Sequence, residues 1–199
     1  FAQDQGVVVV TPEDAEAHSN RTVERYLSGS WRNANDPNSE IAILTFLTGG
    51  RYALGVFHID PNCGDGLEFG NYQLDAAAMR MTVTDVLLDF TGNEEAPTDC
   101  GLYEDGEGAS PKVTMVTPTR MIMTFDDGDV TFNKVVTDGF SGSWGRAGDG
   151  LLHLLADGRY LQVQLGDDGD VDSHRGVETG TWSVNSQGAL SATPTQDAN

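Results

Sequence analysis

The sequence lacks any long run of apolar residues. No stretch approaches the roughly 18 to 20 apolar residues that a transmembrane helix requires, so we expect no membrane span. Cysteine is scarce too, because the chain contains only Cys63 and Cys100, and neither has a second cysteine or a histidine at metal-binding spacing. A disulfide between them is favoured over two free thiols, and it would indicate an oxidising compartment.

Basic residues are also few. The 11 lysines and arginines stand against 31 acidic residues, which gives a formal net charge of −20. Such a field repels nucleic-acid phosphates and anionic lipid surfaces, so no nucleic-acid partner is expected. The acidic residues are spread among turns such as Asp126-Asp127-Gly128-Asp129, which is typical of solvated loops on a folded protein.

The chain begins with Phe1 instead of Met. We therefore expect that an upstream segment has been removed, although no export signal is visible in the sequence. The expected localisation is secreted, periplasmic or on the cell surface. The expected disulfide fits the same location.

Short segments with a period of two are abundant. Ile41, Ile43 and Leu47 alternate with their neighbours, and Gly49-Gly50 ends the run in a turn, which predicts a β-hairpin. Further strands are expected at 51–58, 66–74, 78–87, 112–116, 120–125 and 130–136. With the strand that begins at Trp31, the count is eight. Eight successive antiparallel strands predict an all-β fold with an up-and-down barrel, because closure removes exposed sheet edges.

The segment before these strands has a different pattern. Val7 to Val10 form a β-branched run that suits the edge of a sheet. Thr11 then fits an N-cap position, with Pro12 at the first helical position. These residues predict a short helix over about 12–27.

Three short motifs occur twice in the same order. Ser-Gly-Ser-Trp occupies 28–31 and 141–144, Gly-Arg-Tyr occupies 50–52 and 158–160, and Gly-x-Glu-x-Gly occupies 66–70 and 176–180. The copies are 113, 108 and 110 positions apart, so about one whole unit separates them. The chain therefore divides into an N-terminal strand and helix at 1–27, a barrel at 28–138 and a partial second copy at 139–199.

The second copy has room for about four strands. Such a fragment would expose one sheet edge and half of a core, so it should not be stable alone. Three arrangements are open: a truncated unit, a sheet packed on the first unit, or a half-barrel completed by another chain.

Gly29-Ser30-Trp31, at the head of the first strand and after a short helix, resembles the Gly-x-Trp signature of lipocalins and the wider calycin superfamily. In that superfamily a basic residue on the last strand lies across the tryptophan, and Lys134 occupies the corresponding place here. The run from Trp31 to the last strand is similar to repeated lipocalin-like domains of bacterial secreted and surface proteins. The resemblance implies a barrel with Gly29, Trp31 and Lys134 as its structural signature and Trp144 as the second copy's tryptophan.

No catalytic constellation is present. Ser141 and Ser143 lie among glycines, but the Gly-x-Ser-x-Gly elbow and its strand-to-helix context are missing. The four histidines are widely separated and form no zinc motif. We therefore expect that the protein is not an enzyme.

Four methionines are candidates for lining the barrel. Alternation predicts that Met79 and Met81 share one strand face and that Met121 and Met123 share another. Their thioethers would contact a small apolar ligand or copper(I), although filling of the core is favoured.

Two acidic features have a functional and a structural interpretation. Asp167, Asp168 and Asp170 leave a loose calcium site open, as an alternative to a solvated turn, but no cofactor is otherwise expected. Glu68 and Glu178 occupy the same repeat position, which predicts a bulged strand whose carboxylate accepts hydrogen bonds from nearby backbone or from the arginines at 51 and 159.

The sequence therefore favours a non-catalytic structural or interaction module with a protein partner. Self-association is a specific form of this hypothesis, in which the strand Val7 to Val10 of one molecule pairs with the open sheet edge of residues 140–199 in another. The alternative is a carrier that binds a small apolar ligand inside the barrel.

Overall fold

A computed structural model describes residues 23–35, 41–57, 66–89, 101–104, 106–146, 150–164 and 176–198. Several predicted features lie outside these residues, namely the strand at 7–10, Cys63, Cys100, Asp167, Asp168 and Asp170. The disulfide and the calcium site therefore stay predictions. Residues 23–27 are helical and lie at the end of the range 12–27 predicted as a helix, and the rest of that range lies outside the described residues.

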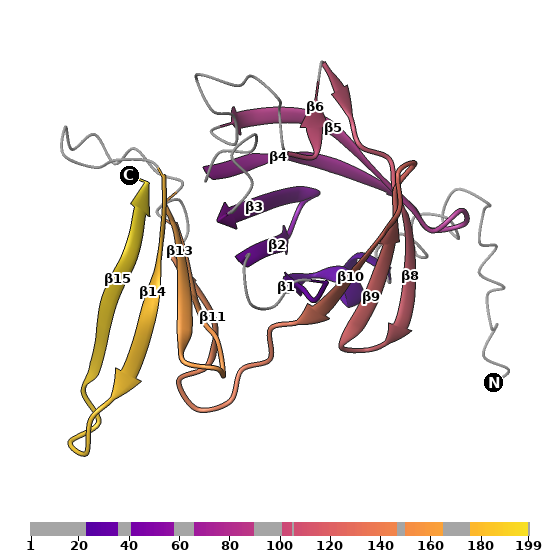
Figure 1. Ribbon diagram of the computed structural model, residues 1–199. Coiled ribbons are helices and arrows are strands. Elements are labelled where there is room, and N and C mark those ends of the chain that lie inside the picture. The colour runs from indigo at the N-terminus through magenta and orange to yellow at the C-terminus, as the bar shows by residue number, and fades with distance from the viewer. Residues whose placement is uncertain are drawn as a thin grey trace, which may run out of the picture.

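The first unit is a closed antiparallel barrel (Figure 1). Its strands are β1 (Gly29–Asn33), β2 (Ile41–Leu47), β3 (Arg51–Phe57), β4 (Gly66–Asp75), β5 (Arg80–Asp89), β8 (Lys112–Thr117), β9 (Arg120–Thr124) and β10 (Asp129–Lys134). Each strand pairs with its neighbour in the sequence, and β1 pairs with β10 to close the ring. This confirms the predicted all-β fold with an eight-stranded antiparallel barrel.

The shortest ladder of the barrel lies between β5 and β8, where it contains one residue pair, Arg80 with Lys112. The short hairpin of β6 (Tyr103–Glu104) and β7 (Glu107–Gly108) lies beside this opening. After the hairpin, the carbonyl groups of Ala109 and Pro111 accept hydrogen bonds from the Val83 and Met81 amides of β5. This irregular segment therefore continues the sheet where β8 does not reach.

The second unit is an open sheet of five strands, one more than the predicted four or so. The strands are β11 (Gly142–Arg146), β12 (Gly150–Leu154), β13 (Arg159–Gln164), β14 (Gly176–Val184) and β15 (Leu190–Ala198). They repeat β1 to β5 in order and register, because Trp31 pairs with Leu44 in the barrel and Trp144 pairs with Leu152 in the sheet. Among the described strands, none pairs with the outer edge of β11 or of β15.

A shared bulge gives independent support to the repeat. The register shifts between Phe69 and Gly70 on β4, and between Thr179 and Gly180 on β14, which are 110 positions apart in each case. This is the irregularity that the repeated Gly-x-Glu-x-Gly motif predicts.

The sheet packs on the outside of the barrel through its own core. Ile41, Ile43, Phe57 and Leu67 from the barrel wall meet Leu155, Leu161, Val163 and Val177 from the sheet. Gly55 permits this approach, because a Cβ there would lie 2.6 Å from Val163 Cγ2. Arg32 adds an ion pair to Asp157, with Nη1 2.8 Å from Oδ2. Of the three arrangements left open by the sequence, the structure has a sheet packed on the first unit.

The two units use corresponding surfaces for this contact. By their strand registers, Leu161 corresponds to Ala53, Val163 to Gly55 and Val177 to Leu67. All of these residues point outward from a barrel wall. The face of the second sheet that corresponds to the inside of a barrel is therefore turned away from the first unit.

Candidate functional site

Trp31 of the barrel is buried, and its indole ring has both a hydrogen-bond partner and a cation. The Trp31 side chain is 0% exposed, and its Nε1 donates a hydrogen bond to the Leu27 carbonyl oxygen at 2.6 Å. Lys134 is the register partner of Trp31 on β10, and its Nζ lies 4.9 Å from the centroid of the indole ring. The same ammonium donates to the Tyr26 carbonyl oxygen at 3.2 Å. Burial lowers the pKa of Lys134.

Glycine begins both copies of this motif for a backbone reason. Gly29 has φ +107° and Gly142 has φ +141°, values that side chains with a Cβ rarely adopt. A Cβ at Gly29 would lie 3.4 Å from Lys134 Cε, so the lysine stem passes at contact distance from the strand, and the backbone conformation is the reason for glycine here.

The second copy of the signature is intact but uncovered. Trp144 Nε1 donates to the Phe140 carbonyl oxygen at 3.0 Å, which repeats the bond from Trp31 to Leu27. The Trp144 side chain is nevertheless 46% exposed, and Phe140 is 47% exposed. No strand among the described residues occupies the position that β10 takes beside β1. Within the described part of the chain, Trp144 therefore has its local partner but no cation over its ring and no covering strand.

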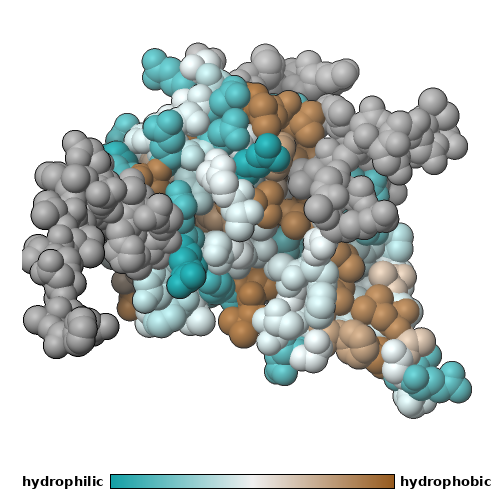
Figure 2. All heavy atoms as spheres, turned by 180° about the vertical axis from the view of Figure 1, so that it is seen from behind, coloured by the Kyte–Doolittle hydropathy of each residue, from teal (hydrophilic) through white to brown (hydrophobic). Residues whose placement is uncertain are grey.

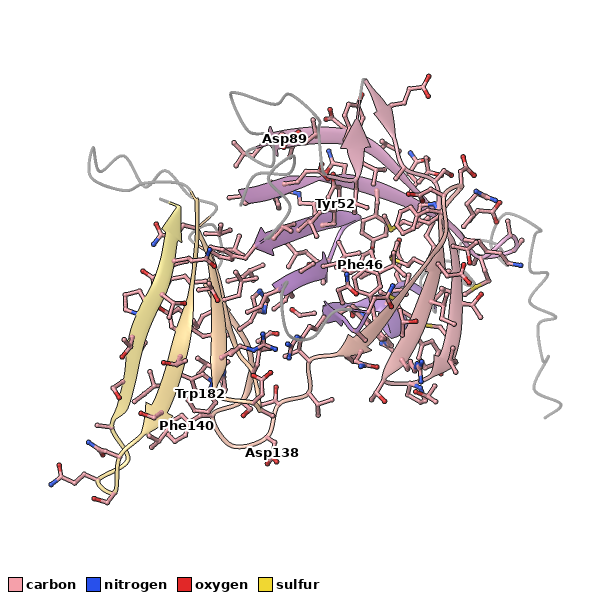
Figure 3. The ribbon with its side chains drawn as sticks, in the orientation of Figure 1. Phe46, Tyr52, Asp89, Asp138, Phe140 and Trp182 are labelled. Carbon is pink, nitrogen blue, oxygen red and sulfur yellow. The ribbon has the colours of Figure 1, made fainter. Side chains whose placement is uncertain are left out.

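Further apolar surface lies on the same unit. Leu190 at the start of β15 is 41% exposed. Figure 2 shows apolar surface at the lower end of the second sheet, next to a polar tip, and Figure 3 places Phe140 and Trp182 toward that end. This end of the unit combines exposed apolar side chains with sheet edges that the described strands leave unpaired.

Buried polar pairs recur at corresponding positions. Ser30 Oγ lies 2.9 Å from Thr45 Oγ1 in the barrel, and Ser143 Oγ lies 3.0 Å from His153 Nδ1 in the sheet. Burial lowers the pKa of His153 from its usual 6.5 to about 4. His153 Nε2 is buried without a hydrogen-bond partner in the described part of the chain. The neutral imidazole is therefore a structural element of the contact between the two units.

The repeated glutamate is better explained by its tyrosine than by an arginine. The Tyr52 hydroxyl donates to Glu68 Oε1 at 2.5 Å, and the Tyr160 hydroxyl donates to Glu178 Oε1. Glu68 is fully buried and also accepts hydrogen bonds from the backbone amides of Leu102 and Tyr103 at 2.9 to 3.1 Å.

These contacts partly match the expectation from the sequence. Backbone donors do reach Glu68, and Arg159 forms an ion pair with Asp157, with Nη2 3.0 Å from Oδ2. Burial raises the pKa of Glu68, although its hydrogen bonds from Tyr52, Leu102 and Tyr103 act in the opposite direction. Because Glu68 is sealed inside the protein and held by fixed donors, its role is structural.

The methionine prediction is wrong at one position. Met79 lies in the turn before β5 with φ +50°, and it does not share a strand face with Met81. Asp75 Oδ1 accepts hydrogen bonds from the amides of Ala77 and Ala78, which prolongs the turn to residue 79. Met81, Met121 and Met123 are fully buried in the barrel core, as the core-filling interpretation expects.

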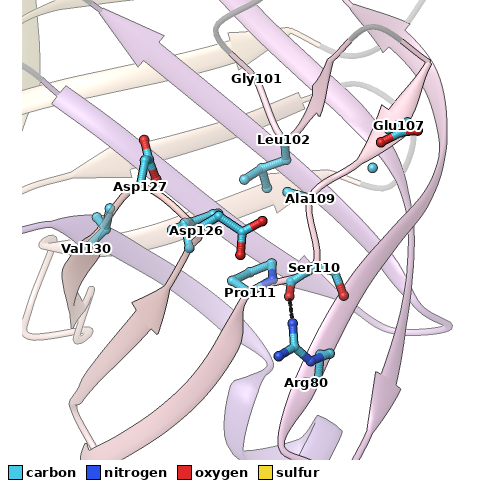
Figure 4. Close-up of a pocket in the computed structure, with 12 residues that line it drawn as sticks. Arg80, Gly101, Leu102, Glu107, Ala109, Ser110, Pro111, Asp126, Asp127 and Val130 are labelled. Carbon is cyan, nitrogen blue, oxygen red and sulfur yellow. Dashed lines mark hydrogen bonds between the residues drawn. The ribbon is translucent and has the colours of Figure 1, made fainter.

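A cavity of about 750 Å³ lies at the mouth of the barrel (Figure 4). It is bordered by apolar side chains of Leu102, Phe125 and Val130 and by the charged side chains of Arg80, Asp126 and Asp127. Arg80 Nη1 donates to the Ser110 carbonyl oxygen at one side. The methionines are not among the residues that line this cavity. The sequence did not predict the cavity, because its walls come from segments that are far apart in the chain.

Two further features are absent from the described residues. Within them, no three histidine, cysteine or acidic side chains are grouped so as to hold a metal ion. No helix in that part of the chain is long and apolar enough to cross a membrane.

Comparison with known proteins adds no assignment: no protein-family model, curated protein or solved structure matches the chain. The class that the structure defines is therefore an all-β protein with a closed eight-stranded barrel and a packed partial copy of it. The edge of β11, which no described strand pairs with, lies beside the exposed Trp144.

Proposed function

We propose that the protein is a non-catalytic, extracellular interaction module of lipocalin-like type that self-associates through its incomplete second unit. The observation that carries this proposal is the contrast between two equivalent tryptophans. Trp31 is fully buried beneath β10 and Lys134, whereas Trp144 is 46% exposed beside an edge of β11 that no described strand pairs with.

The backbone geometry supports strand addition at β11. On β1, the Ser30 carbonyl accepts from the Val135 amide, and the Ala34 amide donates to the Thr131 carbonyl, so alternate residues of β1 face β10. The corresponding groups on β11 are directed at the open edge. Main-chain hydrogen bonds there would provide affinity, and burial of Trp144 and Phe140 would add to it.

The barrel serves as a rigid support in this proposal. The second sheet is held by an apolar core and by the ion pair between Arg32 and Asp157. The open side of the sheet is therefore presented in a fixed orientation, which lowers the entropy lost on association.

Sedimentation equilibrium over a wide concentration range tests the proposal. We expect the wild-type mass to rise in multiples of 21.3 kDa and Trp144→Ala to weaken this association. Val116→Ala, at an exposed apolar residue on β8 of the barrel, is the matched control and should associate normally. A wild-type mass of one chain at every concentration would overturn the proposal.

The mouth cavity favours a second candidate function, the carriage of a small amphipathic molecule. Its volume of about 750 Å³ lies in the range of ligand sites, and its lining of both apolar and charged side chains suits a ligand with one apolar and one polar end. Binding of a solvatochromic dye should be lost in Val130→Trp, which fills the cavity, and retained in the exposed-site control Val136→Trp. Equal dye binding by both variants would exclude this candidate.

A further inference from the structure

The internal repeat extends to the N-terminal residues. Residues 8–21 align without a gap with residues 121–134, at the offset of 113 that separates Trp31 from Trp144. Identical pairs are Thr11 with Thr124, Asp14 with Asp127 and Asn20 with Asn133, and conservative pairs include Val9 with Ile122, Glu13 with Asp126 and Arg21 with Lys134. The alignment continues through the Ser-Gly-Ser-Trp motif itself.

The matched residues have a defined place in the complete unit. Residues 121–134 comprise nearly all of β9, its turn and β10, the last hairpin of the barrel. That hairpin is what covers Trp31, and it belongs to the group of strands that the second sheet lacks. The local pattern of residues 12–21 predicts a helix, but the repeat favours a hairpin there, with Glu13-Asp14-Ala15-Glu16 in the place of the turn Asp126-Asp127-Gly128-Asp129.

We propose that residues 8–21 of one copy form this hairpin on a second copy, pair with the open edge of β11 and place Arg21 over the ring of Trp144. The inference rests on the proposed self-association and specifies its donor segment and register. A guanidinium over an exposed indole is a favourable partner, and arginine is the more common cation in such pairs. We apply the register of β1 with β10 to the proposed pair. In the barrel Phe132 lies opposite Asn33, and at the offset of 113 these positions correspond to Ser19 of one copy and Arg146 of the other.

The occupant is assigned to a second copy because the corresponding edge in the donor's own barrel is filled. There β10 already pairs with β1, and Lys134 holds the Tyr26 carbonyl. Val23 and Leu27, just after the segment, pack against the barrel core. The donor segment precedes the complete unit and the half-barrel follows it, so each contact is head-to-tail. Such contacts generate rings or open series of molecules.

A disulfide test fixes both the segment and the register. Ser19→Cys protein is mixed with Arg146→Cys protein under mild oxidation, and the joined peptides are identified by mass. We expect a link between the two introduced thiols, one at position 19 of one molecule and the other at position 146 of its neighbour. The matched control replaces the second partner with Ser191→Cys on β15, which should give no such link. Absence of the link between positions 19 and 146 in associating protein would overturn the donor assignment.

A charge series tests the Arg21 contact independently. Arg21→Ala should weaken association by about 3-fold to 30-fold, as expected for loss of a cation from an indole face, while Arg21→Lys should retain most of it. Arg21→Ala should have no effect in the Trp144→Ala background. If the wild type associates but the Arg21 variants do not differ, the inference fails and the proposed function stands; if the wild type never associates, both fail.

Discussion

Lys134 Nζ lies 4.9 Å from the centroid of the Trp31 ring, across the seam where β10 closes on β1. The two residues join the last strand of the barrel to the first. The seam is also fixed by Trp31 Nε1, which bonds to the Leu27 carbonyl, and by Lys134 Nζ, which bonds to the Tyr26 carbonyl. The helical residues 23–27 and both ends of the barrel are thus tied at one point.

Removal of this cation should destabilise the barrel. Lys134→Met keeps the apolar stem but removes the charge, and we expect a loss of about 0.5 to 2 kcal/mol in the free energy of unfolding. Lys134→Arg should retain stability. Urea unfolding measures both, with Lys112→Met at an exposed position as the control. Equal losses for the two lysines would refute a specific role for the seam.

The two repeated glutamates should differ sharply in their contribution to stability. Glu68→Ala leaves the buried Tyr52 hydroxyl, the buried Leu102 amide and the half-buried Tyr103 amide without their acceptor, so we expect a loss on the order of 3 kcal/mol. Glu178 is only half-buried and receives the Tyr160 hydroxyl, so Glu178→Ala should lose about 1 kcal/mol. Thermal and urea unfolding of the two variants compare them directly, and a larger loss at Glu178 would contradict the structural role assigned to Glu68.

His153 should make the contact between the units sensitive to acid. Its pKa is about 4 in the folded protein and 6.5 ordinarily, so the unfolded chain takes up a proton first as the pH falls. The contribution of neutral His153 to the free energy of unfolding is therefore fully present above about pH 6.5. It declines as the pH falls towards 4, by about 3 kcal/mol in total. His153→Thr restores the residue type found at the equivalent Thr45 and should abolish this decline.

The comparison with His153→Thr distinguishes the pH dependence caused by His153 from that caused by the carboxylates. Arg32 and Arg159 outweigh the effect of burial and lower the pKa of Asp157 from 3.8 to about 2, so its contribution is lost only at more acid pH. Glu68 has a raised pKa and acts with the opposite sign, because the folded state gains its proton first. Unfolding curves between pH 4 and 7 that coincide in shape for wild type and His153→Thr would contradict the prediction.

The apolar contact should hold the second sheet on the barrel. Leu161 is fully buried between the units, so Leu161→Ala should cost about 2 to 5 kcal/mol and loosen the sheet before the barrel. Limited proteolysis should then cut the second unit and leave a resistant barrel fragment. The exposed-site control Leu190→Ala should resist as the wild type does, and simultaneous loss of both units would indicate a single cooperative fold instead.

Much of the architecture could be predicted from the sequence because it depends on local signals. Alternation with a period of two, together with glycine and aspartate turns, locates all eight barrel strands. The prediction fails where a side chain changes the local backbone, as at Met79, where Asp75 caps the preceding turn and delays the start of β5 to Arg80.

Long-range features could not be predicted in the same way. The repeat identifies Glu68 and Glu178 as equivalent, but nothing local indicates that Leu102 and Tyr103 return to cover only Glu68. The burial of His153 likewise depends on the packing of two sheets, and the mouth cavity depends on three separate segments. The incomplete second unit was visible in the sequence, but its packing on the barrel wall was one of three alternatives.

If another molecule covers the edge of β11, the backbone amides at that edge should be protected from hydrogen exchange. Ser30 and Ala34 face β10, so Arg32 between them does too, and its counterpart Gly145 directs its amide at the open edge. Exchange is measured at low and high protein concentration, with the β15 edge as the internal control. We predict that protection of the Gly145 amide rises with concentration while β15 is unchanged. Rapid exchange of that amide at every concentration would contradict the account.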